Sequence, residues 1–215
     1  MLRVEGLCLR YPKQEQPLLR ELSFSLAPGE LLWLKGPNGS GKTSLLNILS
    51  GIIPQRVKAE LSGAVTLGAT DLGTLPLNEK FHHLAYQMCD PDHQIFFPRI
   101  SKELSFALEN SGMEASRMRA RLARAKERFG LLEFGQVEPG QLSRGQKKLL
   151  TLAVCAALDP PLQLLDEPTS ALSSEAMDRL LAWLREILAS GRMVVVAEHN
   201  PVISGLATAT LEFGP

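Results

Sequence analysis

The 215-residue sequence predicts an α/β fold in which a parallel sheet is joined to an N-terminal antiparallel β portion and an inserted α-helical segment. Two observations carry this prediction. Strands and helices alternate at both ends of the chain, as is typical of a parallel sheet with crossover helices. Between these ends the patterns are mainly helical, as expected of an insert of about 70 residues.

Each element follows from a local pattern. Apolar and polar residues alternate at 2–9 and 22–26, which indicates half-buried strands. A continuous apolar run at 31–34 is typical of a strand covered on both faces. Further strands are predicted at 65–67, 84–87, 162–165 and 193–197, and helices at 44–49, 101–129, 144–158 and 173–189.

The charge balance and apolar runs limit the classes of partner. Lys and Arg total 23, as do Asp and Glu, so the chain lacks the basic character of many nucleic-acid-binding proteins. The longest apolar run, at 149–158, is about half of the ~20 residues that a membrane span needs. We therefore expect a soluble chain with no nucleic-acid partner, which meets a membrane only through other proteins.

A glycine-rich loop follows the apolar strand at 31–34 and matches G-x-x-x-x-G-K-[ST] at every fixed position. Its glycines let successive N–H groups point at phosphate oxygens, and the next helix adds its positive N-terminal end. The lysine reaches the β- and γ-phosphates and the threonine hydroxyl binds Mg²⁺. This predicts a P-loop NTPase core whose nucleotide-binding residues are Gly36, Pro37, Asn38, Gly39, Ser40, Gly41, Lys42, Thr43 and Ser44.

Two carboxylates, Asp166 and Glu167, end the apolar strand at 162–165. Strand ends line the ligand crevice in an open α/β sheet. We expect Asp166 to hold Mg²⁺ and Glu167 to activate the attacking water as a general base. The alternative is a polar strand end that leads into the turn at Pro168.

The signature segment, Leu142–Gln146, precedes a wide apolar helix. In order along the chain, the phosphate loop, this segment, the Asp-Glu strand end and His199 resemble the ATP-binding cassette (ABC) family over essentially the whole chain. The resemblance implies one ABC ATPase domain at 1–215, with an α-helical subdomain inserted at 88–158. It also implies that two such subunits pair head to tail around two ATP molecules.

The resemblance assigns further roles. Tyr11 resembles the aromatic residue that stacks on adenine. Gln87 resembles the glutamine that senses Mg²⁺ and the attacking water, and His199 the histidine that contacts the γ-phosphate. The implied catalytic residues are thus Lys42, Gln87, Glu167 and His199, the metal-binding residues are Thr43, Gln87 and Asp166, and the nucleotide contacts in the opposite subunit are Ser143, Gly145 and Gln146.

Each role has a simpler alternative. Tyr11 could cap a strand, Gln87 could be an ordinary polar strand end, and His199 could be structural. The chain also departs from the family pattern twice. Arg144 stands where the signature carries glycine, and Ser173 stands where an aspartate helps to couple the two nucleotide sites.

The segment Asp90–Phe97 resembles the N-P-D-D-Q-hydrophobic-F stretch of energy-coupling-factor importers, which take up vitamins and transition-metal ions. The resemblance implies that a transmembrane coupling subunit docks near Gln87–Phe97, with Ile95, Phe96 and Phe97 as an apolar floor. The alternative is that Phe96 and Phe97 belong to the core of the insert.

We therefore expect an ATP- and Mg²⁺-dependent ATPase subunit of a membrane importer, peripheral at the cytoplasmic face of the membrane and powered by ATP-driven dimer closure. Alternatives are the ATPase of another ABC branch, a soluble ABC protein that acts on DNA or ribosomes, or a degenerate cassette that binds ATP without hydrolysis. Glu167 and His199 argue against the last of these.

Overall fold

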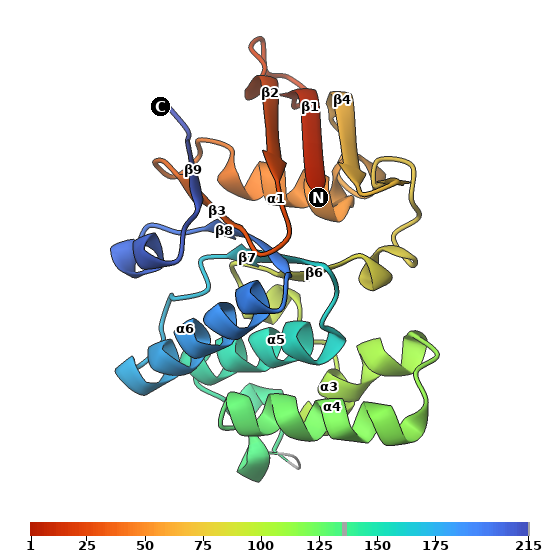
Figure 1. The fold of residues 1–215 in the computed structure, drawn as a ribbon, viewed down its shortest axis with the longest axis vertical. Coiled ribbons are helices and arrows are strands. Elements are labelled where there is room, and N and C mark those ends of the chain that lie inside the picture. The colour runs from red at the N-terminus through yellow and green to blue at the C-terminus, as the bar shows by residue number, and fades with distance from the viewer. Residues whose placement is uncertain (135–136, 215) are drawn as a thin grey trace.

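The computed structural model describes residues 1–134 and 137–214 and contains two β-sheets and a set of helices (Figure 1). The first sheet is antiparallel, with strand order β2-β1-β4-β5. It lies at the top of Figure 1 and includes the N-terminus. Its strands are β1 (Leu2–Arg10), β2 (Leu19–Leu26), β4 (Glu60–Leu67) and β5 (Thr70–Asp71).

The second sheet is parallel, with strand order β6-β7-β8-β3-β9. Both β7 and β8 are buried along their whole length, which explains their continuous apolar sequence. Because all five strands run the same way, their carboxyl ends lie at one edge of the sheet. The strands are β3 (Leu31–Lys35), β6 (Leu84–Gln87), β7 (Leu162–Asp166), β8 (Met193–Ala197) and β9 (Ala209–Glu212).

The helices form two groups around the parallel sheet. Helix α1 lies behind the antiparallel strands in Figure 1, whereas α5 and α6 lie below the parallel sheet and α3 and α4 lie farther out. Short 3₁₀ turns connect several elements. The helices are α1 (Lys42–Ser50), α2 (Ile52–Gln55), α3 (Ile100–Asn110), α4 (Ala115–Arg128), α5 (Arg144–Leu158) and α6 (Ser174–Ala189), and the 3₁₀ turns are η1 (Lys80–His82), η2 (Pro91–His93), η3 (Leu132–Phe134), η4 (Pro139–Gln141) and η5 (Pro201–Gly205).

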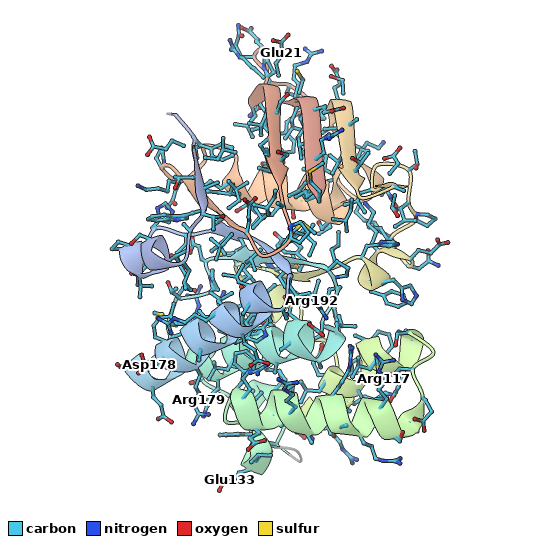
Figure 2. The ribbon with its side chains drawn as sticks, in the orientation of Figure 1. Glu21, Arg117, Glu133, Asp178, Arg179 and Arg192 are labelled. Atoms are coloured by element: carbon cyan, nitrogen blue, oxygen red, sulfur yellow. The ribbon has the colours of Figure 1, made fainter. Side chains whose placement is uncertain are left out.

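Alternate residues of the parallel strands face two hydrophobic cores. In β3, Leu31 and Trp33 pack in the core formed with helices α3, α4, α5 and α6. Leu32 and Leu34 pack instead against α1 and the antiparallel sheet. Glu21 lies at the periphery, at the tip of the antiparallel sheet in Figure 2. The parallel sheet is therefore the central layer between two cores.

This architecture confirms the predicted fold class, and α5 spans the predicted range. The single helix predicted at 101–129 is wrong, because α3 and α4 are separate helices. Gly112 adopts a left-handed φ of 66° between them, and the Glu114 side chain caps the first turn of α4. Strand β4 begins five residues before the predicted start, and β9 was not predicted.

Within the ranges described, no helix combines the length and the apolar character that crossing a bilayer requires.

The contact between Phe129 and Trp183 joins the end of α4 to α6, with ring centroids 5.6 Å apart in an edge-to-face arrangement. Trp183 is only 1% exposed. We expect Trp183→Ala to lower the free energy of unfolding by about 3–5 kcal/mol because it leaves a large cavity. Urea denaturation measures this change, with Leu132→Ala as a control at a side chain that is 64% exposed. A loss below about 1 kcal/mol for Trp183→Ala would contradict the packing described here.

Candidate active site

The phosphate loop, Gln87, Asp166, Glu167 and His199 lie at or next to the carboxyl ends of the parallel strands. The phosphate loop, residues 36–43, connects β3 to α1. Gly36, Gly39 and Gly41 have φ values of 146°, 81° and 109°, which side chains rarely allow. A Cβ atom at Gly36 would also lie 2.6 Å from the carbonyl oxygen of Phe213. Gly36 and Gly41 match the fixed glycine positions of the motif, because their backbone conformation is one that other residues rarely adopt.

The N-terminal end of α1 suits an anion. Gly41 is its N-cap residue, and no side chain caps the first turn. The first N–H groups of a helix have no partner within the helix, and the helix dipole favours negative charge at this end. These N–H groups are therefore able to donate to phosphate oxygens.

Lys42 lies inside the loop and is 7% exposed. Its Nζ donates to the carbonyl oxygens of Gly36 and Pro37, each at 2.8 Å. Burial lowers the pKa of Lys42, whereas the charges of Glu167 and Asp166 raise it. The ammonium group is thus held among loop carbonyls on the side where a bound phosphate would meet it.

Asp166 connects three elements of the site. Its Oδ2 accepts a 2.8 Å hydrogen bond from Thr43, and its backbone oxygen accepts one of 3.3 Å from Gln87 Nε2. The Oε1 atom of Gln87 is buried without a hydrogen-bond partner among the described residues. Oxygen atoms of a hydroxyl, a carboxylate and an amide are the ligand types that Mg²⁺ takes, so these three residues fit the ion.

Burial is the main cause that raises the pKa of Asp166, and the charge of Glu167 adds to it. The hydrogen bond from Thr43 and the positive charges of Lys148 and then Lys42 act in the opposite direction. A carboxylate in this setting gains from a bound cation, because the cation offsets the cost of burial.

Glu167 and His199 face each other across neighbouring strand ends. The distance from His199 Nε2 to Glu167 Oε1 is 3.8 Å. Glu167 has a left-handed φ of 47°, and its N–H donates to Ala197 O at 2.8 Å. Left-handed backbone at a residue other than glycine costs about 1 kcal/mol, and such strain is common at functional sites.

Glu198 was missed by the sequence analysis. Its carboxylate is buried and accepts hydrogen bonds from Thr169 N (3.1 Å), Thr169 Oγ1 (2.6 Å), His199 N (2.8 Å) and Asn200 N (3.0 Å). It therefore joins the turn after Glu167 to the strand end that carries His199. An acidic residue directly after the apolar strand β8 is the signal that could have identified it.

Tyr11 lies beside the beginning of α1. Its hydroxyl oxygen is 3.0 Å from the Oγ of Ser44. The ring is half-buried at the end of β1 and packs against the core on the side of α1. The structure therefore brings Tyr11 and Ser44 together next to the phosphate loop.

The signature segment lies at the N-terminus of α5. Ser143 is the N-cap residue and forms a capping box with Gln146, in which Ser143 N donates to Gln146 Oε1 at 2.8 Å and Gln146 N donates to Ser143 Oγ at 3.2 Å. A Cβ atom at Gly145 would lie 2.4 Å from Ala171 O, so only glycine fits there. These bonds are local, and none joins the segment to the phosphate loop of the same chain.

The two departures from the family pattern lie at helix starts. Arg144 is exposed in the first turn of α5. Ser173 is the N-cap residue of α6 and accepts a 3.3 Å hydrogen bond from Ala176 N.

The coupling segment, residues 87–97, leaves the site after β6. Glu103 Oε2 accepts hydrogen bonds of 2.9 Å from the N–H groups of Phe96 and Phe97. The Phe96 side chain is 78% exposed, so its assignment to the core of the insert is wrong. Phe97 is half-buried and contacts Phe106 in a tilted arrangement, with the ring centroids 4.7 Å apart. A groove of about 330 Å³ beside these rings is lined by Asp92, Ile95, Phe96, Phe97, Pro98, Glu138, Pro139, Gly140 and Lys147.

Comparison with known proteins identifies the family of this chain. The model of the family described as ABC transporter matches residues 19–170. The nickel import ATP-binding protein LarO of Lactiplantibacillus plantarum is 30% identical over 93% of this chain and 83% of its own length. A relative in Methanosarcina acetivorans is 32% identical over 93% of this chain, which spans only 37% of that protein.

Two solved structures share the fold. A dimeric ATP-binding cassette, MJ0796, bound to ADP and phosphate has a TM-score of 0.87 at 22% identity, covering 99% of this chain and 94% of its own. CbiO1 from Clostridium perfringens, part of the transporter complex CbiONQ, has a TM-score of 0.79 at 24% identity, covering 98% of this chain and 83% of its own. The chain therefore belongs to the ABC transporter family, as an ATP-binding ATPase domain.

Proposed function

We propose that this chain hydrolyses ATP with Mg²⁺ and that the energy drives a membrane importer. The observation that carries the proposal is the convergence of Lys42, the Thr43–Asp166 hydrogen bond and the Glu167–His199 pair at one edge of the sheet. Together they supply a phosphate cradle, a metal site and a base, which are the parts that phosphoryl transfer to water needs.

In the proposed reaction, phosphate-loop N–H groups and Lys42 hold the phosphates of ATP. Thr43, Asp166 and Gln87 would hold Mg²⁺, which neutralises developing charge on the phosphate oxygens. Glu167 accepts a proton from the attacking water while the water oxygen bonds to the γ-phosphorus and the bond to ADP breaks. His199, 3.8 Å from Glu167, would donate to the γ-phosphate.

A second copy or a related subunit would complete the site. Ser143 and Gln146 form the capping box of α5, and the positive end of the helix dipole at this N-terminus, next to Gly145, would suit a phosphate held by another subunit. Tyr11, beside Ser44, would stack on adenine. ATP would thus form part of the interface and link dimer closure to nucleotide binding.

The exposed Phe96 and the adjacent groove are the proposed docking site for a transmembrane coupling subunit. Large apolar side chains gathered on a surface commonly mark a protein contact. Relatives named for nickel import and for a CbiONQ complex support an energy-coupling-factor importer for a vitamin or transition-metal ion. The chain would then be one domain, with its helical subdomain at 88–158, peripheral at the cytoplasmic face of the membrane.

Glu167→Gln tests the hydrolysis proposal. We expect turnover to fall about 10²–10⁴-fold because a neutral amide does not accept the proton of water, whereas ATP binding persists. Phosphate release and equilibrium binding of a fluorescent ATP analogue measure the two effects. Glu175→Gln makes the same change at an exposed residue of α6 and serves as the control. Turnover of Glu167→Gln within about twofold of the unaltered protein would reject Glu167 as the base.

Phe96→Asp tests the docking proposal. We expect loss of copurification with the co-expressed membrane subunits and unchanged ATP binding, because a charge would replace an exposed apolar contact. Leu132→Asp is the matched control, since its side chain is 64% exposed on a different surface segment. Equal recovery of the membrane subunits with both variants would place the docking site elsewhere.

A further inference from the structure

Lys148 is a buried cation that the proposed mechanism does not use. It lies in the second turn of α5, the helix that begins at the signature segment, and its side chain is 0% exposed. Its Nζ donates to Cys89 O at 2.5 Å and to Met88 O at 3.4 Å. Lys148 therefore connects α5 to the first two residues after Gln87.

The two carbonyls belong to a strongly constrained turn. Met88 O also accepts a hydrogen bond from Gln87 Nε2. Met88 N donates to Gln94 Oε1 at 3.0 Å, and Gln94 Nε2 donates to Tyr86 O at 2.8 Å. Lys148 and Gln87 thus share one acceptor, so a shift of the Lys148 ammonium displaces the hydrogen bond that orients the Gln87 amide.

The buried ammonium group of Lys148 destabilises the fold unless other groups offset its loss of hydration. Removing an ammonium group from water costs several kcal/mol, and an apolar side chain of similar length fills the same space without that cost. Here the carbonyls of Met88 and Cys89 and the charges of Asp166 and Glu167 offset it. Lys148 in turn lowers the pKa of Asp166 more strongly than Lys42 does. The cation therefore acts on the carboxylates as well as on the turn.

We propose that Lys148 is a positioning residue for ATP hydrolysis. It holds the Gln87 side chain in place relative to Asp166 and Glu167, and it makes the turn after Gln87 move together with α5. This inference rests on the proposed function, because Gln87 and Glu167 act in hydrolysis only if the chain is an active ATPase.

Lys148→Met, Lys148→Arg and a control, Lys126→Met on α4, test the proposal in the complete ATPase. We expect Lys148→Met to lower kcat at least about tenfold with KM for ATP within about twofold, because the phosphate loop and Lys42, which would hold the nucleotide, make no hydrogen bond with Lys148. The thermal midpoint of each variant shows whether a loss of kcat is accompanied by a loss of stability. Lys148→Arg keeps the charge and should recover most of kcat, and Lys126→Met should match the unaltered protein.

Three results overturn the proposal: full kcat in Lys148→Met, a rise in KM with unchanged kcat, or a kcat for Lys148→Arg no better than that for Lys148→Met. Hydrogen exchange supplies a readout that is independent of turnover. Exchange of the Met88 amide should accelerate in Lys148→Met, whereas β7 and β8 should be unchanged. Unchanged exchange at Met88 overturns the inference even if the protein hydrolyses ATP, whereas an unaltered protein without turnover overturns the proposed function instead.

Discussion

The hydrogen bond from Thr43 to Asp166 is the contact on which the rest of the site depends. It joins the first turn of α1 to the end of β7, and so sets the phosphate loop against the centre of the parallel sheet. The backbone oxygen of the same aspartate accepts from Gln87 at the end of β6. The next residue, Glu167, donates its N–H to Ala197 at the end of β8. One strand end thus aligns the ends of its two neighbours.

Asp166 and Glu198, two buried carboxylates at the site, differ in how many hydrogen bonds they accept, and this difference distinguishes their roles. Glu198 accepts four hydrogen bonds, two from Thr169 and one each from His199 and Asn200, so its acceptor positions are occupied within the protein. Asp166 has a side-chain hydrogen bond from Thr43, and burial raises its pKa. A carboxylate with lone pairs that accept no hydrogen bond is able to bind a cation. A carboxylate whose lone pairs all accept hydrogen bonds instead stabilises the local fold.

The sequence predicted those parts of the site that short motifs encode. The phosphate loop, Asp166 and Glu167 follow apolar strands, and α5 has a strong apolar pattern and a capping pair, so local signals located them. The role of Lys148 could not be predicted in the same way, because Cys89, whose carbonyl it contacts, lies 59 residues away in the chain. For Glu198, the sequence shows an acidic residue after β8, but not its contact with Thr169, which is 29 residues away. Strand β9 is mostly exposed and polar at the sheet edge, so its sequence carries little strand signal.

Phe96 shows why the sequence alone did not decide whether these side chains lie on the surface or in the core. An apolar pair at 96–97 fits either location, and the difference depends on Glu103, whose carboxylate binds both backbone N–H groups.

The contact of Glu103 with this backbone also affects how a displacement of Gln87 would reach the protein surface. The coupling segment is held near Gln87 by Gln94 and Lys148 and at Phe96 by Glu103. A segment with free ends would absorb a displacement of Gln87 by local motion of its backbone. A segment anchored at both ends transmits that displacement to the surface, since packed and hydrogen-bonded elements shift as units. The exposed Phe96 ring lies at the outer end of this unit, at the docking site proposed above.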